Sequence, residues 1–174
     1  AICLLAALPS TLRNQCYSAA AEDYFYTHPV KSQFARLIAN AFPFRRYEDA
    51  QRSLQACARI LERGDSLLFF PEGTRSPTGQ LQRFRKGIGA LVQGKSYPVI
   101  PAYLQGTYEA LAKGRLRPQA AIVRLRIGSP QQFQDAPLGE ASAIAIANHL
   151  YACVQALGNT EPIDNSRSLG ERHG

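Results

Sequence analysis

Cysteine is sparse in this sequence, and its spacing excludes two common uses of the residue. The chain has only Cys3, Cys16, Cys57 and Cys153, with no Cys-x-x-Cys pair and no histidine beside any of them. Neither a metal site nor a disulfide framework is therefore expected. Isolated thiols of this kind are typical of a protein in a reducing compartment.

Methionine and long apolar runs are also missing. The longest apolar opening, AICLLAALP, is much shorter than the roughly 20 residues that a membrane span needs. No basic segment precedes it, as one would in a signal peptide. Since the chain contains no methionine and Ala1 stands inside an apolar run, we expect a fragment that continues upstream.

Acidic residues are outnumbered by basic ones. Twenty Lys and Arg, 16 of them Arg, oppose 13 Asp and Glu and give a formal net charge of +7. The planar arginine fork suits phosphate and carboxylate groups, so an anionic partner is expected: a nucleic acid, an anionic membrane or a phosphorylated small molecule. A basic, soluble surface without such a partner has the same composition, and charge alone leaves this open.

Apolar periodicity predicts strands that alternate with helices. We expect strands at 16–22, 66–70, 97–104 and 120–128, an extended piece at 42–46, and helices at 29–41, 48–63, 87–94 and 139–157. This alternation indicates an α/β fold, a single layered domain with a mixed, mostly parallel sheet flanked by helices. The domain is expected to occupy 1–157, and the polar stretch 158–174 to form a disordered tail.

One glycine motif resembles a nucleotide-binding loop. Residues 89–96, GALVQGKS, match the pattern G-x-x-x-x-G-K-[ST]. Such a loop must follow a strand and begin a helix, whereas ALVQ itself favours a helix and Pro98 prevents a long helix from beginning after Ser96. We therefore expect a helix that ends at Gly94 and no nucleotide site.

The most informative stretch is LLFFPEGTRSPTGQLQRFRKG, residues 67–87. A buried strand that ends at Pro71 would place Glu72, Gly73 and Arg75 at the edge of a sheet, where α/β proteins hold their ligands. Gly73 permits a tight turn, and Arg75 can direct its fork at an oxyanion. An ion pair between Glu72 and Arg75 that only stabilises the turn explains the spacing equally well. Three more cations follow: Arg83, Arg85 and Lys86.

The heptapeptide FPEGTRS, residues 70–76, resembles a signature of the glycerolipid acyltransferases, the family of 1-acylglycerol-3-phosphate acyltransferases. Two further segments are similar to other blocks of that family and occur in the expected order, NAFPFRR at 40–46 and YPVIP at 97–101. The heptapeptide is highly specific, whereas the other two segments would be weak signals alone. The resemblance extends over roughly residues 1–157 and implies the α/β fold of that family.

The resemblance implies two groups of site residues. Arg46 and Arg75 would bind the phosphate of the acceptor, because guanidinium forks suit a phosphate dianion. Arg45 stands where relatives often carry Asp, which leaves open whether Arg45 or Arg46 faces the ligand. The predicted acceptor-binding residues are Arg45, Arg46, Glu72, Gly73, Thr74, Arg75, Ser76 and Lys86. The predicted acyl-donor region is Pro98, Val99, Ile100 and Pro101.

The family's catalytic block is a His and an Asp separated by four residues. The His removes the proton of the acceptor hydroxyl, the Asp orients the His, and the hydroxyl attacks the thioester directly. None of His28, His149 and His173 is followed by Asp at that spacing, so no catalytic residue is predicted within the chain. We expect the block just upstream of Ala1 and no acyl transfer by this chain alone; an inactive relative is the alternative.

The leading hypothesis is acyl transfer from a thioester to the free hydroxyl of 1-acylglycerol-3-phosphate, which gives phosphatidic acid in phospholipid synthesis. It implies a lysophospholipid acceptor, an acyl-CoA or acyl carrier protein donor, and no cofactor. The expected location is the cytoplasmic side of the cell membrane, peripheral or anchored by upstream residues, where a basic surface attracts anionic lipid. Alternatives are a non-catalytic relative that binds lipid or an anionic membrane and, least favoured, nucleic-acid binding suggested by KGRLR at 113–117.

Overall fold

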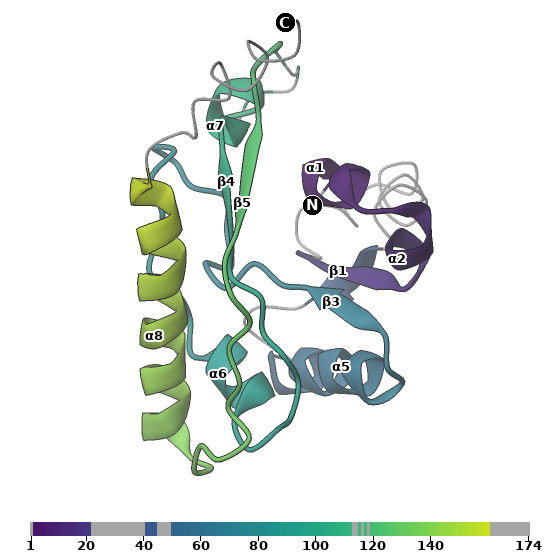
Figure 1. The fold of residues 1–174 in the computed structure, drawn as a ribbon, viewed down its shortest axis with the longest axis vertical. Coiled ribbons are helices and arrows are strands. Elements are labelled where there is room, and N and C mark those ends of the chain that lie inside the picture. The colour runs from purple at the N-terminus through teal and green to yellow at the C-terminus, as the bar shows by residue number, and fades with distance from the viewer. Residues whose placement is uncertain are drawn as a thin grey trace, which may run out of the picture.

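The computed structural model describes residues 2–21, 41–44, 50–112, 115, 117 and 119–160. The helix predicted at 29–41 lies almost entirely outside these residues, as do Arg45, Arg46 and most of the predicted tail. Among the described residues, no helix is both long and apolar enough to cross a membrane. Elements are labelled as in Figure 1.

Three short parallel strands form the first sheet, in the order β2–β1–β3 (Figure 1). The central strand β1 (Cys16–Ala21) pairs with β2 (Ala41–Phe44) on one side and with β3 (Ser66–Leu68) on the other. Ser18 of β1 is only 2% exposed. Parallel strands need long crossover connections, and the chain supplies one between β2 and β3 through a helix.

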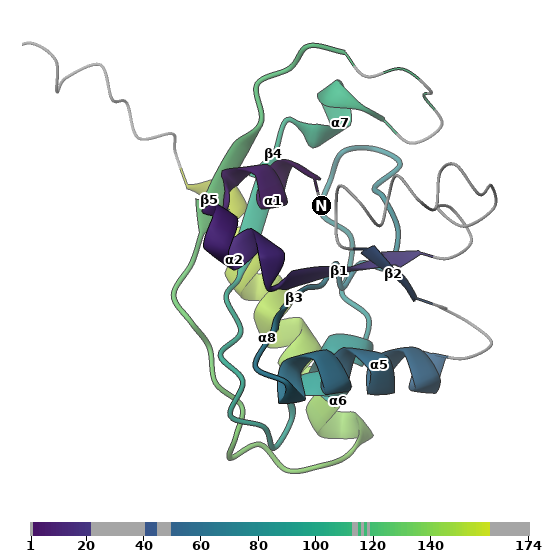
Figure 2. The same ribbon diagram turned by 90° about the vertical axis from the view of Figure 1, so that its right-hand side faces the viewer.

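Helices cover both faces of this parallel sheet. Figures 1 and 2 show α1 (Ile2–Ala7) and α2 (Ser10–Asn14) on one side and α5 (Ala50–Glu62) on the other. Leu5 of α1 is buried against Cys16, and the fully buried Cys57 places α5 on the core. The helix predicted at 48–63 is thus confirmed, and its apolar face points as the periodicity required.

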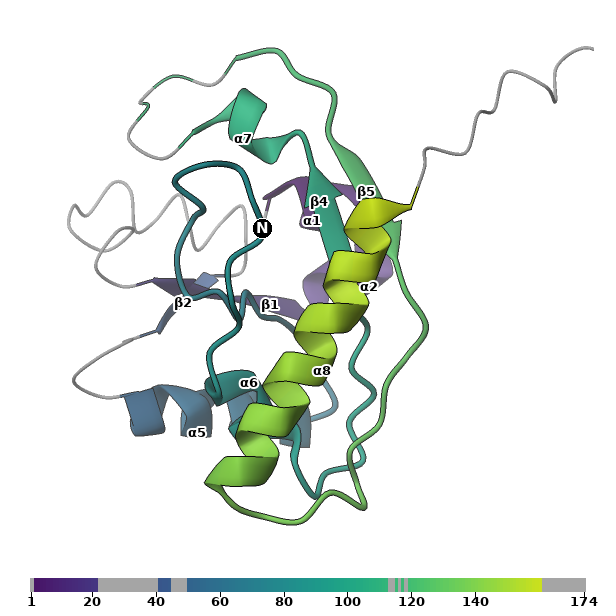
Figure 3. The ribbon, with the colours of Figure 1, turned by 90° about the vertical axis from the view of Figure 1, so that its left-hand side faces the viewer.

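Two antiparallel strands form the second sheet. In it β4 (Ala102–Gln105) pairs with β5 (Arg124–Ile127), and the long closing helix α8 (Glu140–Asn159) covers one face (Figures 1 and 3). The Arg126 guanidinium donates to the carbonyl oxygen of Leu157 at 3.3 Å, so this face lies against α8. On the opposite face Ile127 is 62% exposed.

The short helix α6 (Gly87–Val92) packs between α5 and α8 and carries much of the core (Figure 1). A Cβ added to Gly89 would lie 2.0 Å from the carbonyl oxygen of Ala143, so this glycine lets α6 and α8 approach closely. Gly94 follows the helix with φ +66°, in the left-handed conformation of a helix end. The first four residues of the GALVQGKS segment, 89–92, therefore belong to a packed helix, and Gly94 lies just beyond its end in the capping position that the sequence suggested. The buried core cluster is Cys57, Ile88, Leu91, Val92, Ile146, Ala147 and Leu150.

The predicted α/β class is confirmed, and the structure corrects several boundaries. The strand predicted at 97–104 forms only from Ala102, because the prolines at 98 and 101 have no N–H for a ladder. The closing helix, predicted at 139–157, spans Glu140–Asn159. The helices α2 and α7 (Thr107–Ala110) were not predicted, since each is a single turn without apolar periodicity.

Candidate substrate site

The FPEGTRS segment forms a turn just beyond the end of strand β3. The backbone N–H of Gly73 donates to the carbonyl oxygen of Phe70 at 3.0 Å, and Gly73 has φ +72°. Pro71 occupies the first central position of this four-residue turn, where its fixed φ is favourable. A side chain at position 73 would be strained at this φ, so the turn favours glycine there. The predicted turn is therefore confirmed, whereas the strand predicted at 66–70 ends earlier, at Leu68, and Phe70 is exposed.

Two hydrogen bonds close the long loop that begins at this turn. The Glu72 carboxylate accepts from the backbone N–H of Gln82 at 2.8 Å, and the backbone N–H of Arg85 donates to the carbonyl oxygen of Pro71 at 2.9 Å. Residues ten and fourteen positions apart are thereby joined at the base of the loop. The loop 72–85 is therefore anchored at both ends, with Glu72 as part of the anchor.

The ionisation of Glu72 is shifted by its surroundings. Partial burial raises the pKa of the Glu72 carboxyl above its ordinary value, and the hydrogen bond from the Gln82 N–H opposes this shift. The charged form is therefore harder to maintain here than in water. The sequence left open an ion pair between Glu72 and Arg75, and both that interpretation and the substrate contact remain predictions.

The hydroxyl groups of the signature make local contacts. Thr74 donates to the carbonyl oxygen of Arg75 at 3.4 Å, and the Ser76 hydroxyl accepts from the backbone N–H of Thr78 at 3.3 Å. All residues from Pro71 to Ser76, Arg75 among them, are half-buried. The structure thus brings Glu72, Gly73, Thr74, Arg75 and Ser76 together in one partly accessible turn, and their ligand contacts remain predictions.

The cations after the loop lie in different environments. The Arg85 side chain covers Gly73, because a Cβ built on Gly73 would lie 2.8 Å from the Arg85 Nε and 3.0 Å from its Cδ. Lys86, predicted as a binding residue, is exposed and forms an ion pair with Glu140 at the beginning of α8. Arg83 is exposed. The sequence identifies Arg85 as one of three cations after the turn that add positive charge, but of these only Lys86 was predicted as a binding residue.

The outer end of the loop contacts α7, the short helix that follows β4. Figures 2 and 3 show the loop rising from the parallel sheet towards α7. A Cβ added to Gly79, which has φ +83°, would lie 3.0 Å from the Cγ of the Tyr108 ring. The Tyr108 ring therefore supports the loop near its tip, at the end of β4.

The predicted acyl-donor region runs beside residues 128–131. Val99 and Gln131 exchange two backbone hydrogen bonds of 2.9 and 2.8 Å, and the carbonyl oxygen of Pro101 accepts from Gly128 at 2.8 Å. Val99 packs on the core, whereas Ile100 is 56% exposed and Pro98 is exposed. These contacts continue the antiparallel pairing of β4 and β5, and the donor role of Pro98, Val99, Ile100 and Pro101 remains a prediction.

The one histidine within the described residues belongs to the surface of α8. The Nε2 atom of His149 lies 3.0 Å from the Gln131 Oε1 and 3.6 Å from the Cys153 sulfur, and its ring meets Phe133 edge-on at 6.0 Å. Within the described ranges, no three His, Cys, Asp or Glu side chains gather to hold a metal ion.

The profile of the family described as Acyltransferase matches residues 1–105, which include the whole FPEGTRS turn and its loop. The chain belongs to the acyltransferase family. This acyltransferase is 37% identical to a 1-acyl-sn-glycerol-3-phosphate acyltransferase of Cocos nucifera over 87 residues, 49% of this chain and 28% of that protein. It is 40% identical to the enzyme of that name from Limnanthes alba, over 49% of this chain and 31% of that protein.

A solved structure shares the fold of this acyltransferase. It is that of the 1-acyl-sn-glycerophosphate acyltransferase PlsC from Thermotoga maritima, with a TM-score of 0.61 and 25% sequence identity. The match covers 84% of this chain and 58% of that one. The alignments span about a third of the length of the first curated relatives, 28% to 31%.

Proposed function

We propose that this acyltransferase transfers an acyl group from a thioester to the free hydroxyl of 1-acylglycerol-3-phosphate, which gives phosphatidic acid. The observation that carries the proposal is the FPEGTRS turn beyond the end of β3, where Gly73 makes the turn and Arg75 is half-buried beside it. The matched relatives bear the name of this activity. Ligands of α/β proteins bind beyond the carboxyl ends of parallel strands, which is where this turn lies.

The chain's own part in the reaction is to bind and orient the acceptor. Arg75 would hold the phosphate through charge-assisted hydrogen bonds, while the loop 72–85 fixes the shape of the pocket. The acceptor hydroxyl would then attack the thioester carbonyl: a C–O bond forms, the C–S bond breaks, and the hydroxyl proton passes through a base to the thiolate. That base is predicted to be the His of a His-x-x-x-x-Asp block, which does not occur in these 174 residues. The donor is an acyl-CoA or an acyl carrier protein thioester, and YPVIP is the proposed donor region.

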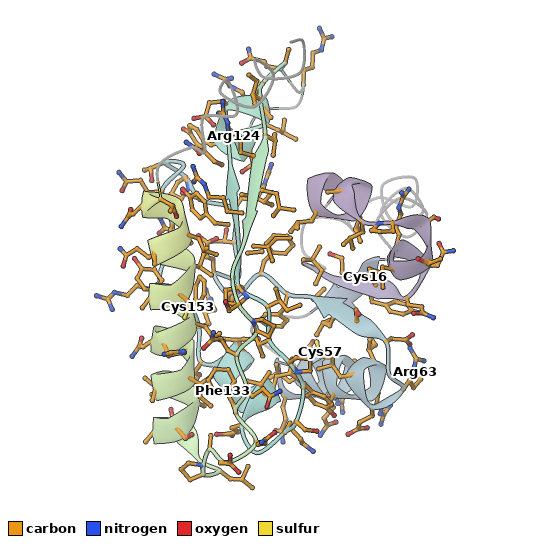
Figure 4. The ribbon with its side chains drawn as sticks, in the orientation of Figure 1. Cys16, Cys57, Arg63, Arg124, Phe133 and Cys153 are labelled. Atoms are coloured by element: carbon orange, nitrogen blue, oxygen red, sulfur yellow. The ribbon has the colours of Figure 1, made fainter. Side chains whose placement is uncertain are left out.

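The test uses the complete enzyme with lysophosphatidate as acceptor. Replacing Arg75 by Ala removes one or two charge-assisted hydrogen bonds, so kcat/KM for the acceptor should fall about 10- to 100-fold with little change for the donor. Arg63→Ala is the matched control, because Arg63 pairs with Asp65 and lies over the Tyr17 ring on another part of the surface (Figure 4). Unchanged acceptor kinetics in Arg75→Ala would refute the phosphate role. A complete protein that binds lysophosphatidate without turnover would instead be a non-catalytic lipid-binding relative.

The domain is also proposed to work on an anionic membrane, at the cytoplasmic side. Between residues 111 and 133 the sequence carries five cations and no acidic residue. Among the described ones, Arg115, Arg117 and Arg124 are exposed, and Ile122 is 73% exposed beside them in sequence. Arg124 lies next to α7 (Figure 4), the helix that contacts the loop 72–85 through Tyr108. This end of the molecule would therefore face the amphiphilic acceptor in its bilayer.

Vesicle sedimentation tests the membrane proposal. Each cation near an anionic surface contributes about 1 kcal/mol, so binding should require anionic lipid and weaken at high salt. Replacing Arg117 and Arg124 together by Ala should lower the bound fraction, whereas replacing Arg59 and Arg63 of the α5 region should not. Equal binding to neutral and anionic vesicles would contradict the proposal.

A further inference from the structure

We propose that Arg85 supplies a second guanidinium for the phosphate of the acceptor and that Gly73 is the residue over which it reaches the site. The inference rests on the proposed function and adds to the site a residue that lies outside the FPEGTRS heptapeptide. It also selects Arg85, and not Lys86, from the cations that follow the loop.

The backbone fixes Arg85 beside the turn. Its N–H donates to the carbonyl oxygen of Pro71 at 2.9 Å, which joins the end of the loop to the residue before Glu72. The preceding residue, Phe84, is anchored in the core, with its ring 5.5 Å from that of Tyr151 in an edge-to-face arrangement. Phe84 is half-buried between the exposed residues Arg83 and Arg85, so the anchor directs these two side chains away from the core.

The side chain of Arg85 then lies over the turn. A Cβ atom added to Gly73 would lie 2.8 Å from the Arg85 Nε, 3.0 Å from its Cδ and 3.6 Å from its Cζ. Gly73 precedes Arg75 by two residues, a separation of at most about 7 Å between Cα atoms. Two guanidinium groups can therefore approach one phosphate from this turn, and forked donors in pairs are well suited to a dianion.

Lys86 differs from Arg85 although it is the next residue. Its ammonium group pairs with the Glu140 carboxylate at the beginning of α8, on a part of the surface where both side chains are exposed. The Lys86 ammonium is thus directed at α8, whereas the Arg85 side chain lies over Gly73 of the turn. The direction of each side chain, which the sequence does not show, is what separates the two cations.

A second feature of this arrangement disfavours any side chain at position 73. The φ of +72° at Gly73 already disfavours a side chain, and any Cβ would collide with the Arg85 Nε at 2.8 Å. A turn that required only the left-handed conformation would accept Asn at a modest cost. The space above Gly73 is filled by Arg85, so Gly73→Asn should displace this side chain from the site.

The test measures binding of glycerol 3-phosphate, with glycerol as the phosphate-free control, to the 174-residue chain by calorimetry or NMR titration. Arg85→Ala should raise the Kd for glycerol 3-phosphate about 10- to 100-fold, and Arg85→Lys should fall between Ala and the wild type, because Lys keeps the charge and loses the fork. Arg83→Ala is the matched control and should change the Kd less than about twofold. Melting temperatures of the variants verify that each is folded.

The outcomes separate this inference from the proposed function. If Arg75→Ala weakens binding while Arg85→Ala binds as the wild type does, the role of Arg85 is wrong and the phosphate site stands. If Arg85→Ala lowers only the melting temperature and leaves the Kd unchanged, Arg85 merely packs on the turn and the inference also fails. If the wild type does not distinguish glycerol 3-phosphate from glycerol, both proposals are overturned. Loss of binding in Arg85→Ala at an unchanged melting temperature, with partial recovery in Arg85→Lys, supports the inference.

Discussion

The carboxylate of Glu72 accepts a hydrogen bond from the backbone N–H of Gln82, with 2.8 Å between Oε2 and N. This bond joins two residues ten positions apart and holds the loop that leaves the FPEGTRS turn. The acid of the signature thus has a partner within the protein itself. A substitution of Glu72 should therefore affect the stability of the loop as well as the binding of any ligand. The effect on stability can be measured alone, from the pH dependence of unfolding without ligand.

Glu72→Gln should change how stability depends on pH. Burial raises the pKa of Glu72 above its ordinary value of 4.5, against the opposing hydrogen bond from Gln82, so the charged carboxylate is less favourable in the folded state than in the unfolded chain. The stability that this group contributes is full below 4.5 and is lost as pH rises through the raised pKa. The amide stays neutral and still offers an oxygen to Gln82. Urea unfolding from pH 4 to pH 7 should show the variant gaining stability relative to the wild type within that window.

Glu140→Gln is the control of opposite sign. The Lys86 ammonium lowers the pKa of Glu140 through a hydrogen bond and charge attraction, so its contribution is present above 4.5 and lost as pH falls through the lowered pKa. The variant should therefore lose stability relative to the wild type above that window, by a small amount because the pair is exposed. Slopes of the same sign in both variants would contradict the assignment of the Glu72 shift to burial.

Gly89→Ala should destabilise the fold. The new Cβ would lie 2.0 Å from the carbonyl oxygen of Ala143 in α8, so the two helices must move apart, at a cost of about 1–3 kcal/mol or more. Gly87→Ala is the matched control in the same helix, because its Cβ would meet nothing closer than Leu54 at 3.7 Å. Chemical denaturation should show the control unchanged or stabilised by up to about 1 kcal/mol. Equal losses in both variants would contradict the close packing of α6 and α8.

Thiol labelling should distinguish the cysteines. Burial raises the pKa of Cys57 to about 12, and the pKa of Cys16 is raised for the same reason, so neither forms much reactive thiolate near pH 8. Cys153 on α8 is partly accessible. In a Cys3→Ser background, Ellman's reagent should react quickly with one thiol of the folded chain. Cys153→Ser should abolish this reaction, and Cys57→Ser should leave it unchanged. If Cys57→Ser abolished the reaction instead, the burial of α5 in the core would be contradicted.

Lys86→Ala should leave phosphate binding nearly intact. The sequence suggested Lys86 as a ligand of the acceptor, but the structure pairs it with Glu140. Its removal should change the Kd for glycerol 3-phosphate less than about threefold, compared with the larger loss expected for Arg75→Ala. A loss as large as that of Arg75→Ala would return Lys86 to the site.

The sequence predicts the elements of this protein better than it predicts side-chain directions. The helix at 50–62 and the strand before Pro71 follow from periodicity and from proline, which are local properties. The second sheet is harder to foresee, because β4 and β5 pair across a connection of 18 residues, 106–123, and no local signal fixes that pairing.

Within the site, the sequence identifies the turn but not its neighbours. FPEGTRS carries its own signals in Pro71 and in the left-handed Gly73. The contact of Arg85 with Gly73 depends on how Phe84 is held by Tyr151 of α8, which lies 67 positions away along the chain. The sequence shows Arg83, Arg85 and Lys86 only as three neighbouring basic residues. Only tertiary packing shows which of their side chains lies at the turn.

The anchoring of Phe84 has a consequence for how this family can vary. Because Phe84 is held by α8 and Arg85 by the carbonyl oxygen of Pro71, both ends of the loop are fixed independently of what lies between Thr74 and Leu81. Insertions or deletions in that interval can be absorbed without moving either arginine, since loop closure depends only weakly on length. The tip of the loop is thus the part that can change in length, while the FPEGTRS turn and its anchor at the base of the loop keep their geometry.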